Sequence, residues 1–148
     1  MSQPTFESRR AVSRAEYFLT CADRCDMSQR NEHEANLEAA MLFGRAELHR
    51  LDHQFKGRAG WKPWWDALRT DESVQFLREQ RDFILKEASP KVGQEIFVGH
   101  SPPGVAHWYF YEDTSIPAAE TIRRHIARIR AISTVTLAKF GTPGEQAA

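Results

Sequence analysis

Three things are scarce in this sequence: cysteine, an excess of charge of one sign, and long apolar runs. The 148 residues include two cysteines, and twenty basic residues balance twenty acidic ones. Two cysteines cannot build the disulfide framework of a small secreted domain, and a balanced charge gives no argument for nucleic acid or a membrane surface as a partner. No stretch approaches the roughly 18 apolar residues of a membrane-spanning helix. We therefore expect a cytoplasmic protein with two reduced thiols, Cys21 and Cys25, and no membrane contact.

Several motifs that would fix an enzyme class are also missing. The chain has no glycine-rich phosphate loop, no nucleophile elbow and no set of zinc ligands. The closest approach to a metal site is His49 and His53, which are one helical turn apart. A metal site in a helical bundle also needs carboxylates on the facing helices, as in Glu-x-x-His motifs. We find no such motif, and we expect neither a metal nor a cofactor.

Apolar residues recur at helical spacing in four long segments, at about residues 9–26, 31–55, 72–88 and 117–140. The segment 31–55 carries the clearest stripe, formed by Leu37, Met41, Gly44, Leu48, Leu51 and Phe55. Because glycine has no side chain, Gly44 on this stripe would let another helix approach closely. A short helix that reaches about residue 69 is expected at the tryptophan-rich stretch, which contains Trp61, Pro63, Trp64 and Trp65.

Between the third and fourth long segments, the pattern changes to short aromatic and β-branched runs. Residues 94–99 and 106–112 flank a loop with two prolines and a glycine, which is typical of a β-hairpin. The predicted fold is mainly α: an antiparallel bundle of four long helices plus a short tryptophan-rich helix, with a small β-hairpin inserted before the last helix. We expect a single domain over residues 1–148, with loose tails at residues 1–8 and 142–148.

Arg81 interrupts the apolar stripe of the third long helix, which otherwise carries Val74, Leu77 and Ile84. A buried arginine is costly to desolvate unless it is paired. One interpretation is structural: Arg81 pairs with an acid from another helix or extends its charged end to the rim. The other is functional: its planar guanidinium is held in a cleft to bind phosphate oxygens.

The pair Arg81–Asp82, with Lys86 four residues further on, resembles the signature of the HEPN (higher eukaryotes and prokaryotes nucleotide-binding) family. That signature is an arginine on a helix, commonly followed by a polar residue, with a histidine shortly after it. The resemblance covers about residues 9–87. It implies a helical bundle, often dimeric, in which the arginines and histidines of both subunits face one cleft. Many members are metal-independent ribonucleases of toxin–antitoxin or phage-defence systems.

Lys86 departs from the family pattern, because it stands where the family has histidine. Lysine is ordinarily protonated at neutral pH and cannot act as a base, although it can bind phosphate. No histidine lies between residues 69 and 99 to replace it. The resemblance thus implies a site of Arg81, Asp82 and Lys86 in an RNA- or nucleotide-associated protein, and it leaves open whether that protein cleaves RNA.

The same resemblance implies a homodimer that associates with RNA or with a protein partner such as a nucleotidyltransferase-type antitoxin. The alternative function is a non-catalytic helical module that self-associates or binds a protein partner. A second basic group lies on the last helix, where no acid separates the arginines, and predicts a nucleic-acid contact surface or a solvated outer face. Its members are Arg123, Arg124, Arg128 and Arg130.

Overall fold

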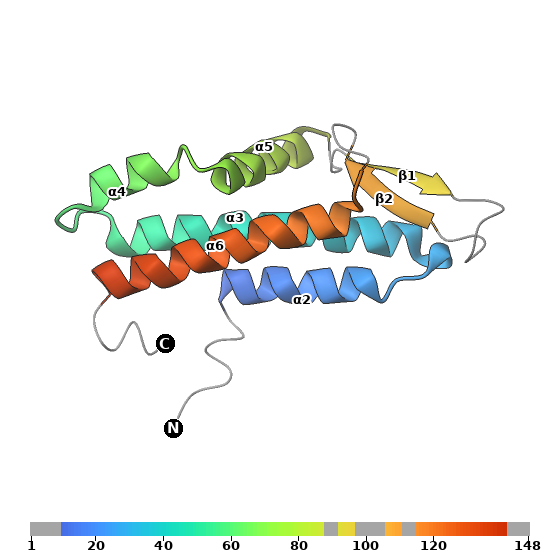
Figure 1. Ribbon diagram of the computed structural model, residues 1–148, viewed down its shortest axis with the longest axis horizontal. Coiled ribbons are helices and arrows are strands. Elements are labelled where there is room, and N and C mark those ends of the chain that lie inside the picture. The colour runs from blue at the N-terminus through green and yellow to red at the C-terminus, as the bar shows by residue number, and fades with distance from the viewer. Residues whose placement is uncertain (1–9, 88–91, 97–105, 111–114, 142–148) are drawn as a thin grey trace, which may run out of the picture.

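Helices make up most of the part of the chain that the structure describes. In this computed structural model, that part comprises residues 10–87, 92–96, 106–110 and 115–141. Its α-helices are α2 (Ala11–Asp23), α3 (Arg30–Phe55), α4 (Trp61–Leu68), α5 (Glu72–Glu87) and α6 (Ala118–Phe140), as Figure 1 shows. A single 3₁₀ turn, η1 (Met27–Gln29), precedes α3. The prediction of a mainly helical class is confirmed, and the predicted tails lie outside the described residues.

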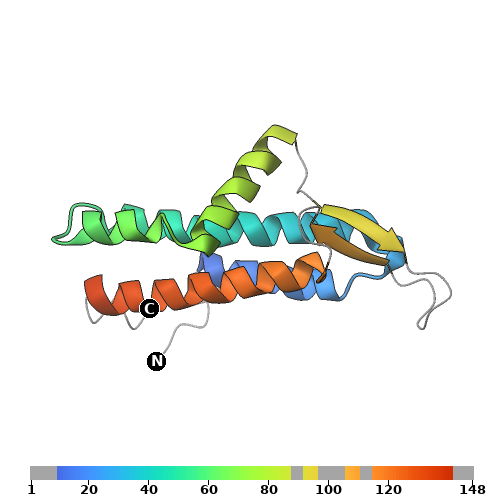
Figure 2. The same ribbon diagram turned by 45° about the horizontal axis from the view of Figure 1, so that its top comes forward.

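The long helices α2, α3 and α6 lie side by side, whereas α5 crosses α3 and α6 obliquely (Figure 2). Helix α2 runs antiparallel to α3, but α3 and α6 run in the same direction (Figure 1). The four long helices thus alternate in direction along the chain, because α5 returns the chain toward the end of the molecule at which α3 begins. The oblique crossing of α5 is the feature that distinguishes the arrangement from a regular bundle (Figure 2).

Gly44 lies where α3 meets α5 and α6, and its missing side chain allows the close approach that was predicted. A Cβ atom at this position would overlap the Cδ1 atom of Ile126 and would lie 3.1 Å from the Cδ1 atom of Leu77. Both neighbours are fully buried core residues. The centre of the core is therefore packed around a position that has no room for a side chain.

A second cluster joins α4 to the C-terminal ends of α3 and α6. Trp61 packs against Phe55 and Phe140, and its indole N–H donates to Asp52 over 2.8 Å. The indole N–H of Trp64 donates to the Thr136 hydroxyl over 3.1 Å. Large indole side chains with satisfied N–H groups fix an element firmly. Helix α4 and its C-cap residue Arg69 are therefore held in place.

A buried polar network joins the start of α2 to α3 and α6. The carboxylate of Glu47, which is 4% exposed, accepts a hydrogen bond from the Val12 amide over 3.2 Å. The same carboxylate accepts from the hydroxyl of Ser133 over 2.5 Å and from Arg10 Nη2 over 3.2 Å. Because buried polar groups are stable only when their hydrogen bonds are made, Glu47 sets how the three helices meet.

Two short strands, β1 (Val92–Ile96) and β2 (Ala106–Phe110), pair in antiparallel register, with Val92 opposite Phe110. The residues between them lie outside the described part of the chain, so the predicted β-hairpin over residues 94–112 stays a prediction. Phe110 is buried against Phe76 of α5. Within the described ranges, no helix has the length and apolar character needed to cross a membrane.

Candidate functional site

Arg81 is only partly buried on α5. The buried residues of α5 are Ser73, Val74, Leu77, Gln80 and Ile84, and the Arg81 side chain is 32% exposed. The helical period of 3.6 residues places Arg81 between Leu77 and Val74, on the predicted stripe. Its long side chain carries the charge from there to the rim.

The Arg81 guanidinium bridges α5 and α3. It donates from Nη2 to Asp82 Oδ1 over 2.7 Å, and its Nη1 lies 3.1 Å from Nε2 of His49. Arginine is only a donor, so Nε2 of His49 is the acceptor and the ring proton lies on Nδ1. The hydrogen bond from Arg81 also lowers the pKa of Asp82. The structure thus pairs Arg81 with its predicted neighbour Asp82 and adds a histidine.

His49 is held in its neutral form at physiological pH. Desolvation of the partly covered ring lowers its pKa most, the charges of Arg45 and Arg81 lower it further, and Asp52 opposes them. A histidine with a pKa below its usual value of about 6.5 is neutral at pH 7. A neutral imidazole beside a guanidinium can accept a proton while the guanidinium holds a phosphate.

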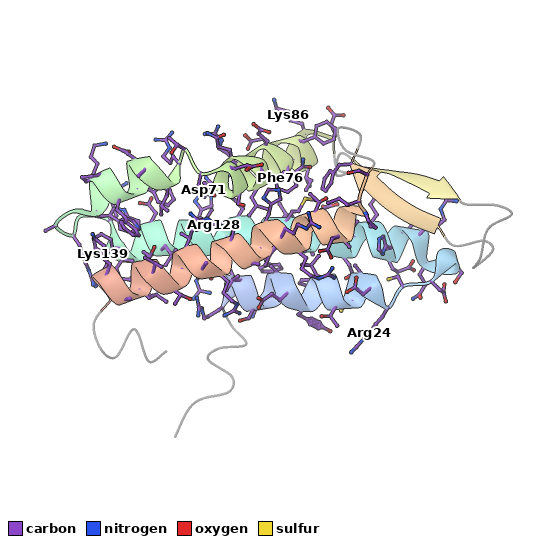
Figure 3. All side chains as sticks on the ribbon, viewed as in Figure 1. Arg24, Asp71, Phe76, Lys86, Arg128 and Lys139 are labelled. Carbon is purple, nitrogen blue, oxygen red and sulfur yellow. The ribbon has the colours of Figure 1, made fainter. Side chains whose placement is uncertain are left out.

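Lys86 is not part of this pair. It is exposed in the last turn of α5 and points away from the helices (Figure 3). It forms no ion pair with any residue in the described ranges. Its charge lowers the pKa of Asp82, although less than Arg81 does, so it is near enough to add positive potential.

The spacing of residues along α5 does not predict His49 as a partner of Arg81. His49 is 32 residues earlier, on α3, and the two residues meet only because α5 crosses α3. One signal was present in the sequence: His49 lies one turn after Arg45, on the side of α3 next to the apolar stripe. A polar side chain at such a position faces whatever helix packs there.

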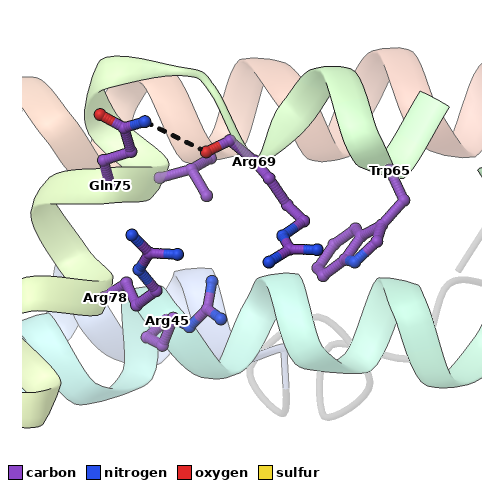
Figure 4. Close-up of a pocket in the computed structure, with 6 residues that line it drawn as sticks. Arg45, Trp65, Arg69, Gln75 and Arg78 are labelled. Atoms are coloured by element: carbon purple, nitrogen blue, oxygen red, sulfur yellow. Dashed lines mark hydrogen bonds between the residues drawn. The ribbon is translucent and has the colours of Figure 1, made fainter. Parts of the chain in front are cut away.

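A surface pocket of about 180 Å³ adjoins this site, between α3, the end of α4 and α5. Its charged lining residues are Arg45 of α3, Arg69 at the C-cap of α4 and Arg78 of α5. Figure 4 shows the three guanidiniums converging, with Trp65 at one side and Gln75 above them. Gln75 Nε2 donates to the Arg69 carbonyl over 3.4 Å. None of these three arginines was predicted from the sequence as a site residue.

The predicted basic surface of α6 is neutralised by acids from other parts of the fold. Arg123 pairs with Asp23 of α2 over 2.6 Å, and Arg130 pairs with Glu16 of α2 over 2.6 Å. Arg128 pairs with Asp71, which it faces in Figure 3, and Arg124 lies 3.5 Å from Glu120. All four residues predicted to bind nucleic acid therefore have acidic partners, and little unpaired charge is left for a phosphate backbone.

His125 of α6 is part of the packing between α5 and α6. Its Nδ1 lies 2.8 Å from the hydroxyl of the buried Ser73, and its ring stacks on Phe76 with 4.0 Å between centroids. Burial lowers its pKa, while Glu72 and Asp71 partly oppose that effect. His125 therefore acts as a neutral packing residue.

His49 and His53, although one helical turn apart, do not belong to a larger group of ligating side chains among the described residues. In the described ranges, no group of three or more histidine, cysteine, aspartate or glutamate side chains is arranged to hold a metal ion. Comparison with known proteins identifies no relative, because no family model, no curated protein and no solved structure matches the chain.

Proposed function

We propose that this chain is a HEPN-like, RNA-associated protein in which Arg81 holds a phosphate of RNA and His49 moves a proton. The proposal rests on one observation: the Arg81 guanidinium lies 3.1 Å from Nε2 of a histidine that is neutral at physiological pH. Arg81 and His49 supply the two side-chain types of the family signature, although the histidine comes from a different helix.

The contact between Arg81 and His49 suggests how a substrate would start the reaction. A phosphodiester carries a full negative charge and competes for the N–H group that Arg81 donates to His49. Once Arg81 turns to the phosphate, Nε2 of His49 has an unoccupied lone pair. It can then take the proton of the neighbouring 2′-hydroxyl.

The deprotonated 2′-oxygen attacks the phosphorus, and the bond from phosphorus to the 5′-oxygen breaks. The products are a 2′,3′-cyclic phosphate and a 5′-hydroxyl, whose proton comes from water. Arg81 stabilises the negative charge that collects on the phosphoryl oxygens in the transition state. Asp82 keeps Arg81 oriented, and Lys86 adds positive potential at the rim.

The family resemblance supplies the biological part of the proposal: a cytoplasmic homodimer in a bacterial defence or toxin–antitoxin system, with a nucleotidyltransferase-type antitoxin as a candidate partner. Both cysteines are unbonded thiols, which fits a reducing compartment. In a dimer of this family, two copies of the arginine–histidine pair would face one cleft.

The test is cleavage of a labelled RNA by the purified chain without metal ions, with the products separated on a gel. His49→Asn should lower the rate by roughly a hundredfold or more, as expected for loss of an acid–base group. Arg81→Ala should weaken RNA binding as well as cleavage. His53→Asn, on the same helix and also exposed, is the matched control and should cleave like the wild type.

If His49→Asn and the wild type cleave RNA at equal rates, His49 has no catalytic role. RNA binding without cleavage in the wild type would reduce the proposal to a binding scaffold. An absence of both binding and cleavage would favour the alternative function.

That alternative is a non-catalytic interaction module, and a groove on the opposite side of α3 favours it. The groove has a volume of about 410 Å³ and lies between α2 and α3, where Tyr17, Phe18 and Phe43 give it an apolar lining. Tyr17 is 57% exposed. Sedimentation of the wild type and of Tyr17→Ser would show whether this groove supports self-association.

A further inference from the structure

The pocket between α3, α4 and α5 holds positive charge that none of the described residues neutralises. Arg45 is only 9% exposed, and its Nε atom has no hydrogen-bond partner. Within the described residues, Arg45, Arg69 and Arg78 form no ion pair. Arginine stays protonated in proteins, so the pocket carries three positive charges.

This arrangement is unfavourable in the unliganded protein. Burial lowers the pKa of Arg45 most, and the charges of Arg81, Arg78 and Arg69 lower it further, against Asp82 alone. A buried charge normally has a partner, because its desolvation costs several kcal/mol. Arg10, whose side chain is 17% exposed, does have one in Glu47. An anionic ligand would supply the partner that Arg45 lacks.

The size and shape of the pocket define the class of anion. A cavity of about 180 Å³ is smaller than the roughly 300–1,000 Å³ of pockets that enclose drug-sized ligands. A single phosphate group matches a pocket of this size, and the rest of a larger ligand would lie outside it.

The charges favour a dianion with several terminal oxygens. Three guanidiniums approach from three different elements (Figure 4). A planar carboxylate offers two oxygens and one charge, whereas a phosphate monoester offers three terminal oxygens and up to two charges. Three arginine forks match three oxygens, with charge-assisted hydrogen bonds to each.

We propose that the pocket of Arg45, Arg69 and Arg78 binds a dianionic phosphate group, either inorganic phosphate or the terminal phosphate monoester of an RNA strand. The site is separate from the Arg81–His49 pair and does not depend on the cleavage proposed above. Loss of cleavage would therefore leave this proposal intact, and loss of phosphate binding would leave the cleavage mechanism intact.

The first experiment titrates inorganic phosphate into the full chain by calorimetry, in buffer without phosphate or sulfate. Arg45→Met keeps the aliphatic stem and removes the guanidinium. Arg24→Met, an exposed position at the end of α2, makes the same change in charge elsewhere. The wild type and Arg24→Met should bind equally, and Arg45→Met should bind roughly ten- to a hundredfold more weakly, as for loss of a charge-assisted hydrogen bond.

Thermal melting gives a second readout that a purely structural arginine would not produce. Phosphate should raise the melting temperature of the wild type but not of Arg45→Met, while chloride at the same ionic strength should raise neither. In phosphate-free buffer, Arg45→Met should melt no lower than the wild type, since an uncompensated charge has been removed. If Arg45→Met does not fold, Arg69→Gln tests the same pocket from an exposed position.

The second experiment identifies the source of the phosphate. Two RNA strands of one sequence, with a 5′-phosphate or a 5′-hydroxyl, are compared for binding. Tighter binding of the phosphorylated strand by the wild type, lost in Arg45→Met, assigns the pocket to RNA ends. Equal binding of both strands, with the response to inorganic phosphate retained, assigns it to the free ion. No response of the wild type to millimolar phosphate, or an unchanged response in Arg45→Met, overturns the proposal.

Discussion

Replacing Glu47 with alanine removes the acceptor at the centre of the buried network that joins α2, α3 and α6. In the wild type, this carboxylate accepts from the Val12 amide, the Ser133 hydroxyl and the Arg10 guanidinium. In the variant, Arg10 loses its only acidic partner among the described residues, and the Val12 amide loses its acceptor. The Ser133 hydroxyl can still accept from Arg10 Nη2 over 2.7 Å, so the loss is partial.

The expected cost is about 3 kcal/mol of unfolding free energy. Breaking a buried ion pair from one side costs about 3–5 kcal/mol, because the other charge is left uncompensated. The lower end of this range applies to Glu47→Ala, because the Arg10 side chain is 17% exposed and water can reach it. Since a domain of this size melts about 2–4 °C lower per kcal/mol, the melting temperature should fall by about 6–12 °C.

The assay is urea denaturation followed by circular dichroism at constant pH and salt. The matched control is Glu16→Ala, which removes the half-exposed partner of Arg130 and should cost about 0.2–1 kcal/mol. Ser133→Ala should fall between the two, because Arg10 and Val12 keep their acceptor. If Glu47→Ala unfolds at the same urea concentration as Glu16→Ala, the network does not hold the three helices in the way inferred here.

Three further predictions follow from the packing and the pKa shifts. Gly44→Ala should destabilise the fold by about 1–2 kcal/mol despite the better helix propensity of alanine, and the penalty should shrink in an Ile126→Val background, measured as a double-mutant cycle of urea midpoints. His125 has a folded pKa below the unfolded value of about 6.5, so the unfolded state binds more protons under acid conditions. Stability should therefore fall as the pH drops below about 6.5, and less steeply in His125→Phe, measured by urea midpoints across that range. Any RNA cleavage should keep its rate down to a pH below about 6.5, because burial and the neighbouring guanidiniums lower the pKa of His49. In Arg81→Lys, which keeps the charge, the acidic limb of the rate profile should stay in place, whereas in Arg81→Ala it should move to higher pH.

The helical class and the role of Gly44 could be predicted because both depend on local patterns. The stripe of α3 follows from the period of the helix, and a glycine on such a stripe marks a close approach whatever the partner is. The same periodicity placed Arg81 on the stripe of α5 but did not show that Gln80 is buried or that Arg81 reaches His49. Both depend on how the helices pack against one another.

The sequence by itself determined where the helices form, that the tryptophans cluster, and that Arg81 and Asp82 are adjacent. Tertiary structure alone decided which arginines are neutralised. Along the chain, Arg123 and Arg130 belong to a basic run, yet α2 supplies acids to both. Arg45, Arg69 and Arg78 look unremarkable in sequence, and they meet because α5 crosses α3 beside the end of α4, with no acid among the described residues paired to them. Charge compensation depends on distance in space, and the spacing of residues along a chain does not report that distance.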